Sequence, residues 1–368
     1  MAFNSKFEEE VALFVSEYIV PHAIEMDETQ NIPDSVIKNI ADRGYFGACV
    51  KSKYGGLDLN TYDMMSLHKI MAKGHGSVEN MLTVTGMVTQ PIQRFGSKEI
   101  REKWLPKIAS GEKIGAIALT EPNAGSDLRA VDTYLTDQQT HFTINGVKRW
   151  ITLGQIADFF LVLCKLNNKT IAVIVEKDTH GVKVKPITNM LGLRANMLAE
   201  IEFTDCKIPK ENAIGNEIDG VSTAINFGLD EGRYTTACGS YGIAELALEE
   251  TLKHLREKDR LNKHQLVQKL LTEMIVEVES AKSFCTAAAG ARETFDFSMI
   301  RKTLLAKYVA SKAATNVSSK AIQILGAKGC HLNSSFTERL YRDAKIMELI
   351  EGSTEIHEVL IAKEFLYA

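Results

Sequence analysis

The chain has 368 residues, of which 45% are hydrophobic and 24% are charged, and its formal net charge is −4. This length predicts two or three structural parts, and the composition is typical of a soluble globular protein. The charge balance excludes a strongly basic nucleic-acid surface, and the longest apolar run, residues 159–164, is far too short for a membrane span. None of the six cysteines has C-x-x-C spacing, which argues against zinc and dithiol sites and favours a cytoplasmic protein with reduced cysteines.

The first part of the sequence has the apolar spacing of amphipathic helices. Such helices are expected at residues 7–25, 36–43, 63–73 and 99–109, with a turn at Gly55 and Gly56. We therefore predict an N-terminal helical domain over residues 1–115.

The middle part has a β pattern instead. Strands are expected at residues 142–147, 159–164, 171–175, 182–184 and 201–203, because apolar and β-branched residues alternate or run together there. The pair Asn145-Gly146 is a strong signal for a hairpin turn. These features predict a β domain over residues 116–217.

The last part is free of proline, since all seven prolines lie at or before Pro209. It is rich in Ala, Leu, Glu and Lys, and its apolar residues recur at helical spacing, as in the stripe at 267, 270, 271, 274 and 278. We predict a bundle of long helices over residues 218–368. The fold class is α+β.

Two motifs of the β domain carry groups that can hold a cofactor. The segment T-E-P-N-A-G-S-D at 120–127 offers hydroxyls and free backbone N–H groups for a phosphate or a polar ring edge, although alone it fits a plain β-turn. Trp150-Ile151-Thr152 places an indole, which can cover an aromatic ring, beside a hydroxyl. By itself, that segment is better explained by a core tryptophan packed on the sheet.

A third motif, near the C-terminus, carries a candidate base. Glu351 follows an apolar stretch and precedes Gly352, which is expected to cap a helix. Partial desolvation there raises the pKa of a carboxyl group and its strength as a base. A solvated glutamate at a helix end is the alternative.

Taken together and in this order, the motifs resemble the acyl-CoA dehydrogenase family. The resemblance implies an N-terminal helical domain, a middle β domain and a C-terminal four-helix bundle, with FAD as cofactor and no metal. It covers nearly the whole chain and includes Y-G-G-L at 54–57, F-G-S at 95–97, W-L-P at 104–106, T-E-P-N-A-G-S-D at 120–127, K-R-W-I-T at 148–152, L-G-L-R at 191–194, I-P at 208–209, Q-I-L-G at 323–326 and R-D-A-K at 342–345.

The resemblance assigns FAD contacts to residues in both domains. Thr120 and Thr152 would contact the flavin ring, Trp150 would lie against it, and Ser126 would bind the pyrophosphate. Members of the family share FAD across a subunit interface, so a homodimer or homotetramer is implied. The further expected contacts are Leu119 and Ile151, the adenine-side residues Gln265, Gln323 and Gly326 from a neighbouring subunit, and Ser353 and Glu355, which would help to close the pocket.

The resemblance also assigns the catalytic base to Glu351. Some members carry the base one residue before the arginine of the substrate helix, here Arg233, but that position is Gly232. Asp230, Arg233 and Gly352 are the expected substrate contacts. Glu351 would remove the α-proton of an acyl thioester while hydride leaves the β-carbon for the flavin. The electrons would then pass to an electron-accepting flavoprotein or another acceptor.

Some positions depart from the family pattern. The usual R-x-x-F-G element is absent around Lys258, the loop before Gln265 is shorter, and Arg256 or Arg260 could take the place of the missing arginine. Glu355 and Leu153 also replace a frequent Gln and a frequent Asn.

The segments at 82–88 and 347–353 are similar to dehydrogenases of methoxymalonyl or aminomalonyl extender-unit pathways. Those enzymes act on short polar acyl groups held by an acyl carrier protein for polyketide biosynthesis, and we expect the same class here. An ordinary acyl-CoA dehydrogenase of fatty or branched acid catabolism is the alternative, and a catalytically silent structural subunit is the non-enzyme alternative.

Overall fold

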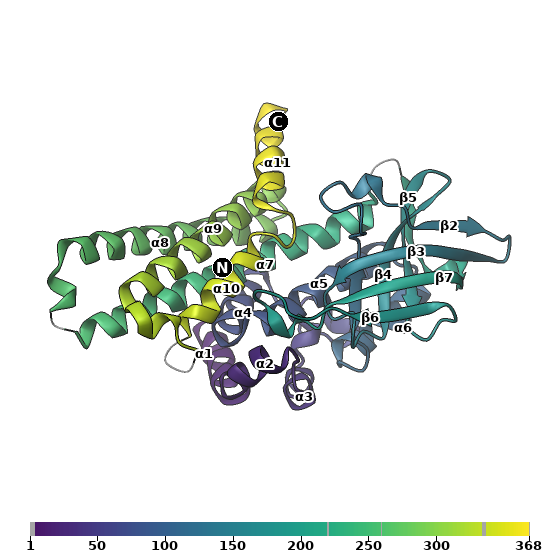
Figure 1. Cartoon of the computed structure of the whole chain (residues 1–368). Helices are drawn as coiled ribbons and strands as arrows, with labels where there is room; N and C mark the ends of the chain where they lie inside the picture. Colours follow the sequence, from purple (N-terminus) through teal and green to yellow (C-terminus); the bar gives the residue numbers. More distant parts are fainter. Residues whose placement is uncertain (1–3, 219–220, 259, 333–335, 368) are drawn as a thin grey trace.

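The computed structural model describes residues 4–218, 221–258, 260–332 and 336–367. The described chain is helical, then β, then helical again, so the predicted α+β fold is confirmed. Figure 1 shows the sheet at one end of the molecule and the long helices extending to the other, with α11 projecting from the helical body. The exact borders at residues 115 and 217 stay predictions.

Side chains cap several of the N-terminal helices, as with Asn60 at α4 and Ser97 at α6. The helix expected at residues 7–25 is interrupted, because Pro21 has no N–H to continue it. Helix α5 escaped prediction, since its β-branched run at 83–85 does not favour a helix. The helices of this part are α1 (Ser5–Phe14), α2 (Ala23–Thr29), α3 (Asp34–Asp42), α4 (Thr61–Gly74), α5 (Gly76–Phe95) and α6 (Lys98–Ala109).

The strands join in one sheet of order β6-β7-β3-β2-β4-β5-β8, with β1 parallel to β4. Strands β4 and β5 are buried along almost their whole length, which confirms the buried strand expected at 159–164. The strands are β1 (Gly115–Ala118), β2 (Tyr134–Asp137), β3 (His141–Ile151), β4 (Phe159–Leu166), β5 (Lys169–Glu176), β6 (Val182–Pro186), β7 (Ala199–Pro209) and β8 (Ala213–Ile218).

The hairpin turn expected at Asn145-Gly146 is wrong. Both residues lie inside β3, at a register shift against β7. A Cβ at Gly146 would lie 2.4 Å from Thr133 Oγ1, so glycine serves a close approach of β3 to the segment just before β2 rather than a chain reversal. The Asn145 side chain bonds across the irregularity to Asp205, at 3.0 Å from Nδ2 to Oδ1.

The C-terminal part is a helical bundle, as predicted. Helices α8 and α9 are antiparallel, because Lys320 late in α9 pairs with Glu273 and Glu277 early in α8. Among the described helices none is long and apolar enough to cross a membrane. The helices are α7 (Thr223–Arg256), α8 (Gln265–Glu293), α9 (Met299–Leu325), α10 (Thr337–Met347) and α11 (Thr354–Leu366).

Candidate active site

Glu351 stands in a tight turn between two helices. Helix α10 ends at Met347, so the expected cap at Gly352 is wrong: the helix stops several residues earlier. Glu351 has φ +54° and Gly352 has φ +96°, so two consecutive residues are left-handed. A left-handed non-glycine residue costs about 1 kcal/mol or more, and such strain persists only where the surroundings impose it.

The turn presses the Glu351 carboxylate against α7. A Cβ added at Gly232 would lie 2.7 Å from Glu351 Oε2 and 2.7 Å from Met87 Sδ. Glycine is therefore what lets the carboxylate lie on the helix backbone. It follows that the position before Arg233 has no room for a side chain while Glu351 occupies this place.

The surroundings of Glu351 make it a stronger base than an exposed glutamate. Burial raises the pKa of Glu351 to about 7, although the charges of Arg233 and Lys307 oppose the rise and Glu79 adds to it. The side chain remains partly accessible to solvent even though protein atoms surround its carboxylate. The expected desolvation of this carboxyl group is confirmed.

Lys307 of α9 lies under the same turn, and sequence reasoning missed it. It is fully buried, and its Nζ donates to the carbonyl oxygens of Gly352 at 3.0 Å and Glu348 at 3.3 Å. Burial lowers the pKa of Lys307 to about 7, against the charges of Glu351 and Glu348. The available signal was a lone lysine within the apolar run at 304–310.

The three histidines 68, 75 and 357 are core residues. His357 packs on Gly352, where a Cβ would lie 3.1 Å from its Cε1, and burial lowers its pKa to about 4. His68 Nδ1 lies 2.9 Å from Glu79 Oε1. Within the described ranges no group of side chains could hold a metal ion.

A buried ion pair joins the two cofactor motifs of the β domain. Lys148 Nζ lies 2.6 Å from Glu121 Oε1 and donates to the Leu119 carbonyl at 2.9 Å. The backbone N–H of Arg149 donates to the Thr120 carbonyl at 2.8 Å. These bonds bring Leu119 and Thr120 beside the end of β3. The sequence held a signal for this ion pair, because Glu121 belongs to the motif at 120–127 and Lys148 to the motif at 148–152.

Trp150 stands at that strand end with its indole open to solvent. Its φ is +62° and its exposed fraction is 46%, while the Arg149 guanidinium lies 4.9 Å from the ring centroid. Ile151 is buried, Thr120 and Thr152 are partly buried, and Ser126 is exposed. An exposed indole flanked by hydroxyls fits a planar aromatic cofactor with polar edges.

The expected adenine contacts lie at the end of the helical bundle that is far from the sheet and from Trp150. Gln265 is the first residue of α8, and Gln323 and Gly326 stand at the end of α9, all exposed. Helix α8 has 29 residues, about 40 Å at 1.5 Å per residue, and Figure 1 shows its start far from the sheet. One chain therefore does not bring these residues to Trp150. In the shortened loop before them, Asp259 lies outside the described residues.

The expected substrate contacts divide between two places. The charge of Arg233 interacts with that of Glu351, and Gly352 belongs to the turn that carries Glu351. Asp230 instead pairs with Arg292, which also contacts Glu231 at 2.5 Å, and it lines a cavity of about 590 Å³ between the N-terminal helices and the bundle.

Ser353 and Glu355 mark the start of α11. Ser353 caps this helix, with its Oγ 3.5 Å from the Ile356 N–H. Glu355 is exposed, and hydrogen bonds from Ser353 and its own backbone N–H lower its pKa.

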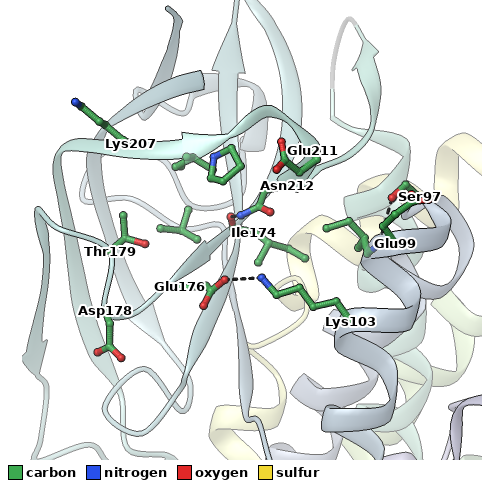
Figure 2. A pocket seen from close by; sticks show the side chains of 14 residues that line it. Ser97, Glu99, Lys103, Ile174, Glu176, Asp178, Thr179, Lys207, Glu211 and Asn212 are labelled. Atoms are coloured by element: carbon green, nitrogen blue, oxygen red, sulfur yellow. Dashed lines mark hydrogen bonds and ion pairs between the residues drawn. The ribbon is translucent and has the colours of Figure 1, made fainter. Parts of the chain in front are cut away.

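A second cavity, of about 650 Å³, lies between α6 and the sheet (Figure 2). Figure 2 shows Lys103 of α6 reaching Glu176 of β5, at 2.7 Å. None of the residues expected at the active site lines this cavity.

The fold and the site define a flavin-dependent oxidoreductase, and the chain belongs to the acyl-CoA dehydrogenase family. Family models match its N-terminal domain at residues 4–112, its middle domain at 116–206 and its C-terminal domain at 219–366. Members of this family bind FAD and oxidise CH–CH bonds.

Relatives cover the whole length of the chain. A short-chain specific acyl-CoA dehydrogenase of Clostridium acetobutylicum is 32% identical, over 98% of this chain and 99% of the relative. The solved structure of the prolyl acyl carrier protein oxidase AnaB is 27% identical with a TM-score of 0.93, and covers 100% of both chains. The structure of FkbI, for biosynthesis of a methoxymalonyl extender unit, is 27% identical with a TM-score of 0.89, over 98% of this chain and 99% of that one.

Proposed function

We propose that this chain is an FAD-dependent dehydrogenase of short polar acyl thioesters in which Glu351 removes the substrate α-proton. The observation that carries this proposal is a buried carboxyl group with a pKa of about 7, fixed on a left-handed turn against Gly232. A base of that pKa takes a proton near neutral pH and still returns to its ionised form. Arg233 and Gly352 would line the place where the thioester lies.

The cofactor would lie at the open indole. Bound FAD supplies a hydride acceptor. Trp150 would cover one face of the ring, Thr120 and Thr152 would bond to its polar edge, and Ser126 would hold the pyrophosphate. The remaining roles go to Leu119 and Ile151 beside the ring and to Ser353 and Glu355 at the start of α11.

A second subunit would complete the cofactor site. The expected adenine contacts lie at the start of α8 and the end of α9, namely Gln265, Gln323 and Gly326. The length of α8, about 40 Å, separates this end of the bundle from the other, so these residues can serve the FAD of a neighbouring chain. A homodimer or homotetramer is the assembly that we infer. We also infer an electron-accepting flavoprotein as the partner that takes up the electrons.

An acyl carrier protein is the proposed bearer of the substrate. The likeness to FkbI, for biosynthesis of a methoxymalonyl extender unit, and to the prolyl acyl carrier protein oxidase AnaB supports this choice. The polar interior around Glu79, whose charge acts on Glu351, supports a polar acyl group: Glu79 is fully buried and accepts from Thr83 Oγ1 at 2.7 Å, and its Oε2 has no partner among the described residues.

Anaerobic mixing with candidate thioesters tests the proposal. The purified protein is expected to be yellow, and its flavin absorbance to bleach with hydroxyacyl or aminoacyl groups on a carrier protein. The same acyl groups on CoA form the matched comparison, and a holo carrier protein without an acyl group is the control. A colourless protein, or a flavin that no thioester bleaches, would contradict the proposed function.

An ordinary acyl-CoA dehydrogenase is the second candidate. The 32% identity to the short-chain specific enzyme of Clostridium acetobutylicum favours it. Faster bleaching by butyryl-CoA than by any carrier-bound acyl group would decide for this candidate.

A further inference from the structure

The turn that carries Glu351 is held from below by a single lysine. Helix α10 ends at Met347, so the carbonyls that follow have no partner within the helix. Lys307 Nζ donates to two of them, that of Glu348 at 3.3 Å and that of Gly352 at 3.0 Å. These two carbonyls stand on either side of Glu351.

We propose that Lys307 is a positioning residue for the proton-abstraction step: it fixes the left-handed turn of Glu351 and, when protonated, adds a positive charge to the surroundings of the carboxylate. This inference rests on the proposed function. A cation suits the carbonyl end of a helix, where the backbone dipoles point toward it. By binding carbonyls on both sides, Lys307 restrains the backbone that aims Glu351 at α7.

The burial of Lys307 argues for more than a backbone cap. A fully buried ammonium group carries a large desolvation cost, and a neutral donor would bind carbonyls at lower cost. What lysine adds is a charge in its protonated form, which the negative charge of Glu351 favours and which in turn favours the ionised form of Glu351. A role toward the carboxylate accounts for a lysine at this position.

The charges around Glu351 come from several elements. Arg233 of α7 and Lys307 of α9 favour its ionised form, and Glu79 of α5 disfavours it. Glu348 of the same turn faces Lys307. His357 of α11 is neutral near pH 7, because burial lowers its pKa to about 4. Removing the Lys307 charge therefore moves the midpoint of Glu351 upward, since Arg233 then acts alone.

The test replaces Lys307 in the flavin-loaded protein. Lys307→Met keeps a long side chain but removes the N–H donors and the charge. Lys307→Arg keeps the donors and the charge. The control is Lys302→Met, five residues earlier on α9 and so about 140° around the helix from Lys307. Flavin content, melting temperature and the rate of flavin reduction by substrate from pH 5.5 to 9 are measured for each.

Lys307→Met is expected to retain flavin, to reduce it about tenfold more slowly at pH 7, and to reach half-maximal rate about one pH unit higher. Lys302→Met is expected to match the parent protein. A Lys307→Met protein with bound flavin, a parental rate and an unmoved midpoint overturns the inference. If that variant loses its flavin, Lys307→Arg decides: a parental midpoint supports the inference, and a shifted one overturns it.

Infrared titration separates this inference from the proposed function. The carboxyl band of Glu351, assigned by its absence in Glu351→Gln, reports the protonation midpoint without any substrate. An upward shift in Lys307→Met supports the role of Lys307 even if every thioester fails to bleach the flavin, a result that would reject the function alone. An unchanged band midpoint rejects the role of Lys307 even if bleaching succeeds.

Discussion

Two buried pairs of glutamate and lysine, one in the β domain and one in the helical bundle, have opposite chemistry. Burial acts to raise the pKa of Glu121, yet direct contact with Lys148 at 2.6 Å and hydrogen bonds to the backbone hold it below its ordinary value. Burial raises the pKa of Glu351 to about 7. Lys307 does not cancel this rise, because its hydrogen bonds go to backbone carbonyls and only its charge acts on the carboxylate.

The two glutamates differ in pKa because Glu121 contacts its lysine directly and Glu351 does not, although both pairs consist of the same residue types. The Glu121 carboxylate is saturated: Lys148 and the backbone N–H groups of Asp132 and Thr133 bind its two oxygens. Such a group is locked in its ionised form and can only shape the loop around Thr120. Within the described part of the chain Glu351 forms no ion pair at hydrogen-bonding distance, so it is free to exchange a proton.

The largest expected effect removes the base. Glu351→Gln should keep bound FAD but lower the rate of flavin reduction by substrate about 10³-fold or more, since general base catalysis contributes about 10²–10⁴. Stopped-flow absorbance under anaerobic conditions measures this rate. Glu121→Gln, the matched change in the saturated pair, should lose far less. Near-normal bleaching in Glu351→Gln would remove Glu351 from its role.

The second effect is on stability. Lys148→Met should lower the free energy of unfolding by about 3–5 kcal/mol, because it leaves the buried Glu121 carboxylate without its partner. Urea denaturation measures the change. Lys103→Met, which breaks an exposed pair with Glu176, should cost about 1 kcal/mol or less. The double variant Glu121→Met/Lys148→Met should recover part of the loss, and no recovery would mean that the pair is not coupled.

Local patterns predicted most of the fold. The buried strand at 159–164 and the proline-free helices follow from hydrophobic period and composition, which depend on near neighbours. The turn at Asn145-Gly146 could not be distinguished from a bulge, because the difference depends on Thr133, which lies just before β2. Helix α5 is buried on nearly every side, so its packing between other elements overrides its β-branched run.

The candidate site was predictable only where its residues form motifs. Glu351, Trp150 and Thr120 each belong to a recognisable run of sequence. Lys307 does not, since its partners are backbone carbonyls some forty residues away, and carbonyls leave no trace in a sequence. The clustering of Gln265 with Gln323 likewise depends on the antiparallel packing of α8 and α9.

A smaller effect follows from the raised pKa of Glu351. Between pH 4.5 and about 7 the unfolded chain loses this proton while the folded chain keeps it, so stability falls as pH rises through that window. Glu351→Gln should therefore exceed the parent in unfolding free energy by about 1–2 kcal/mol at pH 8, and by almost nothing at pH 4.5. Denaturation at both pH values measures this. Glu102→Gln, at an exposed position, should give no such dependence. An equal difference at pH 4.5 and pH 8 would contradict the raised pKa.

The smallest effect sharpens the account of the charges around the base. Glu79 raises the pKa of Glu351, so Glu79→Gln should lower the midpoint of flavin reduction by about half a pH unit, opposite in sign to Lys307→Met. Glutamine can still accept from Thr83 and contact His68, which limits any loss of packing. Glu245→Gln is the control, because that partly buried carboxylate pairs with Lys73 at 2.6 Å. If Glu79→Gln moved the midpoint upward, its charge would not act on Glu351, and the polarity around Glu79 would have to serve the substrate or the fold alone.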